Sequence, residues 1–122
     1  MVLMETPVCN FGEKAIEFNL PGTDGKLWSL DHCAGEKGTL IMFICNHCPY
    51  VKAIQTRLID DVSKLIDIGV NSVAIMSNDP DDYPEDSFEN MQKVAAEYNY
   101  PFPYLFDESQ KLAQAYGAIC TP

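Results

Sequence analysis

The stretch TLIMFICNHCPYV, residues 39–51, decides the fold. Its first part, residues 39–44, is a continuous apolar run with β-branched and aromatic side chains, which is typical of a strand buried on both faces of a parallel sheet. Cys45 and Cys48 follow in a C-x-x-C arrangement, and Pro49 stands where the first residue of a helix is expected. The stretch therefore predicts a thiol pair at the turn from a buried strand into a helix, where open α/β sheets gather their functional sites.

A helix and a second strand are expected after this turn. Apolar side chains recur at spacings of three and four over residues 51–66, as on one face of an amphipathic helix, and Gly69 is expected to cap its C-terminus. Residues 70–77 have the pattern of another buried strand. Strand, helix and strand make a right-handed βαβ unit, so we predict an α/β fold with a central parallel sheet. The apolar face of the helix comprises Val51, Ile54, Leu58, Val62, Leu65 and Ile66.

The flanking segments predict shorter elements. Asp86 and Glu89 have the spacing of a capping box, which predicts a helix from there to about Glu97. The acidic run over residues 79–86 is interpreted as a solvated loop, because it lacks the spacing of a calcium-binding loop. Further expectations, in chain order, are an N-terminal hairpin over 16–30, a loop or single helical turn over 31–38, a short strand over 103–106 and a helix over 109–116.

Length and composition limit the classes of protein. The chain has 122 residues, of which 47% are hydrophobic and 21% are charged, and this fits one globular domain over residues 1–122. Asp and Glu number 18 against 8 Lys and Arg, so the net charge is −10, and an acidic surface repels nucleic acids and anionic membranes. No apolar run approaches the roughly 20 residues of a membrane span, and the N-terminus lacks a signal-peptide pattern, so we expect a cytoplasmic protein.

The chemistry of the chain is expected at its paired cysteines. Pro49 makes Cys48 the expected N-cap, where the positive end of the helix favours a thiolate and where His47 and Lys52 add positive charge. Cys45 lies three residues earlier, so the two sulfurs are expected to meet when the turn closes. A nucleophilic thiolate beside a second thiol is the minimum requirement for thiol–disulfide exchange.

Two other interpretations of these cysteines stay open. Free cysteine is commonly a small core residue, which needs no chemistry at all. Cys45, His47, Cys48 and the distant Cys120 would also suit a soft metal ion. Structural zinc usually takes four ligands from two cysteine or histidine knuckles, and the sequence contains no second C-x-x-C, so we assign no metal.

The string CNHCPYVKAI, residues 45–54, is similar to the peroxiredoxin-like group of the thioredoxin superfamily, within the alkyl-hydroperoxide-reductase and thiol-specific-antioxidant assembly. Residues 21–30, residues 77–87 and the closing GAICTP extend the resemblance over almost the whole chain. The resemblance implies a thioredoxin-like fold with a redox pair and no metal, flavin or nucleotide. It also implies a cis-proline at Pro122, and Asn46, His47, Thr121 and Pro122 are the expected substrate-positioning residues. Cys120, two residues before Pro122, is expected to be either a third thiol near the pair or a core-facing cysteine.

Two departures from the family pattern concern the reaction. Peroxiredoxins place the peroxidatic cysteine in a P-x-x-x-T-x-x-C pattern, and aligning Cys48 with that cysteine puts Cys45 at the threonine position and Ile41 at the proline position. The residues that position the peroxide are therefore missing. Thioredoxins have their proline between the two cysteines, whereas Pro49 follows both. The helix-cap argument favours Cys48 as the nucleophile, and the thioredoxin analogy favours Cys45.

The favoured function is thiol–disulfide oxidoreduction on protein or small-molecule disulfides, with an unidentified thiol as electron donor. A second hypothesis is a thiol peroxidase, in which a peroxide oxidises Cys48 to a sulfenic acid and Cys45 or Cys120 condenses with it. A third is a metal-binding or redox-sensing module without turnover. Nucleic acids and membranes are not expected partners.

The remaining expectations concern other cysteines, the aromatic residues and the end of the chain. Cys9 and Cys33 are interpreted as bystanders, and the aromatic cluster over residues 100–106 as packing residues. The thioredoxin-like fold that the resemblance implies continues past its cis-proline with a hairpin and a helix, and the sequence ends at Pro122. We therefore expect a C-terminally incomplete domain with an uncovered sheet edge and a tendency to self-associate.

Overall fold

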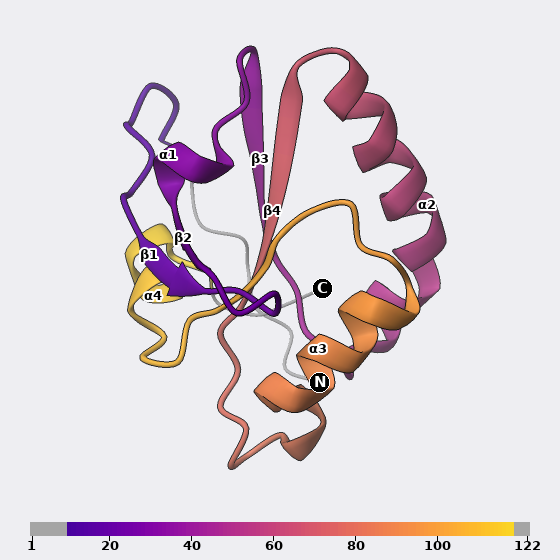
Figure 1. Ribbon diagram of the computed structural model, residues 1–122. Helices are drawn as coiled ribbons and strands as arrows, with labels where there is room; N and C mark the ends of the chain where they lie inside the picture. Colours follow the sequence, from indigo (N-terminus) through magenta and orange to yellow (C-terminus); the bar gives the residue numbers. More distant parts are fainter. Residues whose placement is uncertain (1–9, 119–122) are drawn as a thin grey trace.

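A parallel sheet lies at the centre of the computed structural model, which describes residues 10–118 (Figure 1). Its strands are β3 (Gly38–Phe43), β4 (Val70–Met76) and β5 (Tyr104–Phe106), in the order β3-β4-β5. Both pairings are parallel, with Phe43 opposite Ile75 and Ile75 opposite Leu105. The three predicted strands are therefore confirmed to within one residue at each end.

The two faces of the sheet are covered by different elements (Figure 1). Val73 and Ile75 of β4 belong to one buried cluster, while Ala74 and Met76 belong to the other, as the alternation of a strand requires. Burial on both faces explains why the strand sequences are continuous apolar runs. One side is covered by helices α2 (Pro49–Asp67) and α3 (Phe88–Glu97); the other by α1 (Leu30–Cys33), α4 (Lys111–Tyr116) and the antiparallel hairpin of β1 (Asn19–Pro21) and β2 (Leu27–Ser29).

Helix α2 begins and ends where the sequence predicts. Cys48 is its N-cap with an extended backbone, and Pro49 is the first helical residue. The helix ends at Asp67, and Gly69 follows with a φ of +89°, a left-handed conformation that favours glycine. These two boundaries fix the cysteine pair at one end of the helix and the return to β4 at the other.

The apolar face of α2 is narrower than expected. Val51 and Val62 are buried, but Ile54 and Ile66 are 45% and 43% exposed, so their assignment to the core is wrong. The buried stripe passes instead through Gln55, which is 5% exposed and donates from Nε2 to the hydroxyl of Tyr100 at 2.5 Å. Gln55 lies four residues after Val51 and therefore on the same face of the helix, whereas Ile54 lies at the edge of that face.

The start of α3 also differs from the prediction. Its N-cap is Ser87, whose hydroxyl accepts from the backbone N–H of Asn90 at 3.2 Å, so the capping box of Asp86 with Glu89 is wrong. Asp86 ends a short 3₁₀ helix, η1 (Pro84–Asp86), and is fully buried. The prediction of a solvated acidic loop is confirmed at Asp79, Asp81 and Asp82 and wrong at Asp86.

Two further predictions, the helical turn before β3 and the packing of the aromatic residues, are confirmed. The turn over residues 31–38 contains the single helical turn α1, and the aromatic residues Phe102 and Tyr104 are buried in the core. Among residues 10–118, β3 pairs with β4 along one edge and with no strand along the other. None of the helices formed by these residues is long and apolar enough to cross a membrane. Cys9, Cys120, Thr121 and Pro122 lie outside the described residues.

Candidate functional site

The two motif cysteines lie in the loop from β3 to α2, as predicted. Cys45 is 2% exposed and Cys48 is 7% exposed, and both belong to the cluster between the sheet and helices α2 and α3. Cys48 occupies the N-cap position as predicted, and its side chain makes no capping hydrogen bond with the first turn. The extended backbone at Cys48 supplies the cap geometry, while its sulfur is packed in the core.

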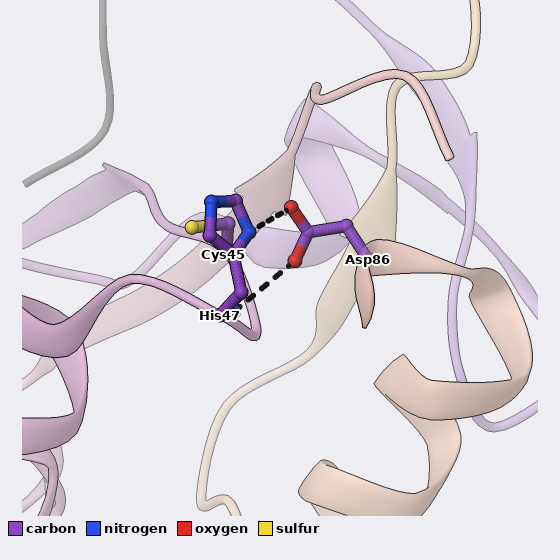
Figure 2. A group of neighbouring side chains, drawn as sticks. All are labelled: Cys45, His47 and Asp86. Atoms are coloured by element: carbon purple, nitrogen blue, oxygen red, sulfur yellow. Dashed lines mark hydrogen bonds and ion pairs between the residues drawn. The ribbon is translucent and has the colours of Figure 1, made fainter. Parts of the chain in front are cut away.

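His47 is held by a carboxylate that the sequence places 39 residues away. Its Nδ1 lies 2.5 Å from Oδ2 of Asp86, and its backbone N–H donates to Oδ1 of the same residue at 3.3 Å (Figure 2). His47 comes from the loop after β3, and Asp86 comes from the end of η1. One buried side chain therefore fixes both the ring and the backbone of His47, a partner that the sequence analysis did not predict.

Asp86 also receives two further donors. The backbone N–H of Asn46 donates to Oδ1 at 2.7 Å, and the side-chain amide of Asn78 donates to Oδ2 at 2.9 Å. Both oxygens of this fully buried carboxyl group are therefore engaged by nitrogen donors, as a buried polar group requires. This contact holds Nδ1 on the carboxylate, so Nε2 is the ring nitrogen that faces away from Asp86.

Cys45 lies beside this histidine. One ring nitrogen of His47, Sγ of Cys45 and a carboxylate oxygen of Asp86 all lie within 4.8 Å of one another (Figure 2). The imidazole is stacked on the ring of Tyr83 at a centroid distance of 4.8 Å, and its side chain is 30% exposed. Chemically, a thiol, an oriented imidazole and a buried carboxylate can act as a nucleophile, a base and the group that orients the base.

Asn46 faces inward from the same loop. Its Oδ1 accepts from the hydroxyl of Tyr104 at 2.8 Å, and its Nδ2 donates to the carbonyl of Glu85 at 3.0 Å. Burial raises the pKa of the Tyr104 hydroxyl well above its ordinary value, and the charges of Tyr100, Asp86 and Cys45 act in the same direction. Tyr104 therefore stays a neutral hydrogen-bond donor that anchors the loop carrying the cysteines.

The side chains at this site include residue types that bind metal ions in proteins. Cysteine, histidine and aspartate are zinc ligands, and Cys45, His47 and Asp86 are near enough to share one ion. Both oxygens of Asp86 are already engaged, however, and Cys48 does not belong to this group within residues 10–118. A carboxylate that orients a histidine is also the usual second partner of a catalytic imidazole, so the arrangement fits proton transfer better than metal coordination.

Cys33 is separate from the site, as expected. It is 3% exposed and packs in the other cluster, on the opposite face of the sheet. Burial raises the pKa of the Cys33 thiol to about 11. The other cysteines and the expected cis-proline region, Cys9, Cys120, Thr121 and Pro122, lie outside the described residues, so their roles stay predictions.

Three residues of the site were not predicted from the sequence: Asn78, Asp86 and Tyr104. The position of residues 77–87 could have indicated Asn78 and Asp86. These residues follow β4, and the carboxyl ends of neighbouring parallel strands lie at the same edge of a sheet. That rule places an acidic residue of this run near Cys45. The rule does not predict which carboxylate of the run lies there, because that depends on the conformation of the loop.

The family follows from a comparison of the chain with models of protein families. The model of the AhpC/TSA family matches residues 11–122. The chain belongs to the AhpC/TSA family. A curated relative of this AhpC/TSA chain, a putative peroxiredoxin bcp from Coxiella burnetii, is 29% identical over 108 residues, which are 88% of the chain and 66% of the relative. The chain thus spans just under two thirds of that relative's length.

Solved structures place this AhpC/TSA chain in the thioredoxin-like fold. An uncharacterized conserved protein from Geobacillus kaustophilus is 46% identical with a TM-score of 0.91, over 98% of this chain and 66% of that one. A putative thioredoxin from Neisseria meningitidis is 24% identical with a TM-score of 0.70, over 88% of this chain and 67% of that one, and shows the fold alone. The predicted thioredoxin-like fold is confirmed.

Proposed function

We propose that this AhpC/TSA chain is a thiol–disulfide oxidoreductase whose redox pair is Cys45 and Cys48. Its substrates would be disulfides of proteins or small molecules in the cytoplasm, and a thiol would return the electrons. The observation that carries the proposal is the position of Cys45 beside His47, whose Nδ1 is held by buried Asp86. A base next to one thiol, with a second thiol three residues away, supplies the groups that thiol–disulfide exchange needs.

The site supports Cys45 as the attacking thiol. His47 takes the proton of Cys45 through its Nε2, directly or through one water molecule, while Asp86 stabilises the resulting imidazolium. The thiolate attacks one sulfur of the disulfide, and the departing thiolate takes the proton back from His47. Cys48 then attacks the sulfur of Cys45 and releases the second thiol. Two electrons leave the protein, a Cys45–Cys48 disulfide forms, and no metal, flavin or nucleotide takes part.

A peroxidase is the second candidate, and the putative peroxiredoxin from Coxiella burnetii favours it. In that case a peroxide would oxidise Cys48 to a sulfenic acid, and Cys45 or Cys120 would condense with it and release water. Cys45 occupies the place of the threonine that peroxiredoxins use, and Cys48 accepts no hydrogen bond at the helix N-terminus. These two features make a disulfide the better substrate.

Mass spectrometry distinguishes the two candidates. The reduced protein is mixed with hydroxyethyl disulfide or with hydrogen peroxide, quenched with an alkylating reagent under denaturing conditions and digested. We expect hydroxyethyl disulfide to produce a Cys45–Cys48 disulfide at the higher rate. Cys33 should stay a thiol throughout, because desolvation raises the pKa of its thiol to about 11 and it packs on the other face of the sheet, away from His47. Faster oxidation by peroxide would identify a peroxidase, and a pair left fully reduced by both reagents would exclude either activity.

Replacing His47 with glutamine tests the base. Glutamine keeps a hydrogen-bond donor toward Asp86 but cannot accept a proton from a thiol, so the rate of disulfide reduction is expected to fall about 100-fold. His32→Gln is the matched control, because His32 is exposed in α1 on the other side of the sheet. Steady-state reduction of hydroxyethyl disulfide measures both variants. Equal rates for His47→Gln and the wild type would remove the base from the mechanism.

A further inference from the structure

A cleft between α2 and α3 reaches the redox site from the side. It has a volume of about 350 Å³, and Cys45 and Asn46 line it together with residues of both helices. Its buried members, Cys45, Asn46, Val51 and Gln55, form the inner end. Small-molecule sites generally have volumes of about 300–1,000 Å³. The cleft therefore has the size of a site for a small molecule and brings that molecule to one cysteine of the pair.

The mouth of the cleft carries both signs of charge. Lys52 of α2 and Lys93 of α3 line it, together with Glu85 and Glu97, and all four side chains are exposed. Among residues 10–118, no carboxylate lies within ion-pair distance of Lys52, and Lys93 makes only an exposed pair with Glu89 at 3.6 Å. Exposed pairs of this kind contribute little, so both ammonium groups are available to a ligand. The two lysines and two glutamates give the mouth a net charge of zero, whereas the whole chain has a net charge of −10.

The inner end offers fixed amides next to the sulfur. The amide of Asn46 is held by Tyr104 and the carbonyl of Glu85, and the amide of Gln55 is held by the hydroxyl of Tyr100. Each of these bonds uses part of the capacity of an amide, which has two N–H donors and an acceptor oxygen with two lone pairs. The remaining donors and acceptors are suited to a ligand that is itself polar close to its sulfur.

We propose that the cleft binds the disulfide of a small amino-acid thiol, a zwitterion with a carboxylate for the lysines and an ammonium group for the glutamates. This inference rests on the proposed function and narrows its substrate. The Cys45 thiolate attacks one sulfur of the ligand, the ligand's S–S bond breaks, and a Cys45 mixed disulfide forms as one amino-acid thiol leaves with a proton. Cys48 then releases the second thiol, so that the ligand gains two electrons and the protein loses two.

Four small disulfides that share one C–C–S–S–C–C core test the charge requirement. Cystine carries both charges, cystamine only ammonium groups, 3,3′-dithiodipropionate only carboxylates, and hydroxyethyl disulfide none. We expect kcat/KM for cystine to exceed each of the other three values by about tenfold or more, since a charge-assisted hydrogen bond is worth about that factor. Insulin, as a protein disulfide, is expected to be reduced more slowly than cystine.

Paired lysine variants locate the effect in the cleft. In the double variant Lys52→Gln and Lys93→Gln, the ratio of kcat/KM for cystine to kcat/KM for hydroxyethyl disulfide is expected to fall about tenfold. The control is the double variant Lys37→Gln and Lys64→Gln, which removes the same charge from exposed positions outside the cleft and should keep the wild-type ratio. Circular dichroism confirms that all variants are folded.

The outcomes separate this inference from the proposed function. If the wild type reduces none of the disulfides, the proposed function fails, and the substrate inference fails with it. If hydroxyethyl disulfide or insulin is reduced as well as cystine, or if the preference for cystine survives in the variant of Lys52 and Lys93, the function stands and the cleft is not the substrate site. A preference for cystine that only this variant loses supports the inference.

Discussion

Replacing Cys45 with serine is expected to reduce disulfide reduction to the background rate, because a serine hydroxyl is not ionised at neutral pH and does not attack disulfides. Replacing Cys48 with serine is expected to have a different result. Cys45 would still attack, but nothing would resolve the product, so a single turnover should leave a mixed disulfide on Cys45. Intact-mass spectrometry would show one added thiol substituent, and peptide mapping would assign it to Cys45.

The control for both cysteine variants is Cys33→Ala. Cys33 lies in the cluster on the opposite face of the sheet, so this variant should keep the wild-type turnover. The assignment of Cys45 as nucleophile would be overturned by a trapped adduct on Cys48 in the Cys45→Ser protein. That result would instead support the helix N-terminus as the source of reactivity.

The second large effect concerns stability. Asp86→Ala removes a fully buried carboxylate that accepts hydrogen bonds from the backbone of Asn46 and His47 and from the side chain of Asn78. Buried donors that lose their acceptor cost about 1–3 kcal/mol each, so the free energy of unfolding should fall by about 3–5 kcal/mol. Urea denaturation followed by circular dichroism measures this change.

Asp82→Ala provides the comparison within the same acidic run. Asp82 is exposed, and such substitutions usually change stability by less than about 0.5 kcal/mol. Equal losses for Asp86→Ala and Asp82→Ala would show that the buried carboxylate does not hold the loops together. Asp86→Asn keeps one oxygen as acceptor and should therefore lose less stability than Asp86→Ala while still losing the proper orientation of His47.

The features that the sequence predicted well are those encoded by neighbouring residues. The apolar runs at residues 39–44 and 70–77 are strands because a parallel sheet covered on both faces needs apolar side chains at consecutive positions. Pro49 starts α2 because its fixed φ suits the first helical turn and its missing N–H would have no partner there. Both causes act over a few residues, so the position of the thiol pair was predictable.

The features that could not be predicted depend on contacts between distant segments. The spacing of Asp86 and Glu89 matches a capping box, yet Ser87 caps the helix, because Asp86 turns inward to the donors of the cysteine loop. Gln55 is polar but buried, because Tyr100 provides a partner for its amide. In each case a hydrogen bond between distant segments, which no short stretch of sequence encodes, determines the structure in place of the local pattern.

The separation of His47 and Asp86 along the chain has a consequence during synthesis. The two residues are 39 positions apart, and the ribosome adds about 5–20 residues per second, so Asp86 is made roughly 2–8 seconds after His47. In that interval the carboxylate of Asp86 is not yet present to hold the imidazole of His47. The contact between His47 and Asp86 can therefore form only after β4 and η1 have been made.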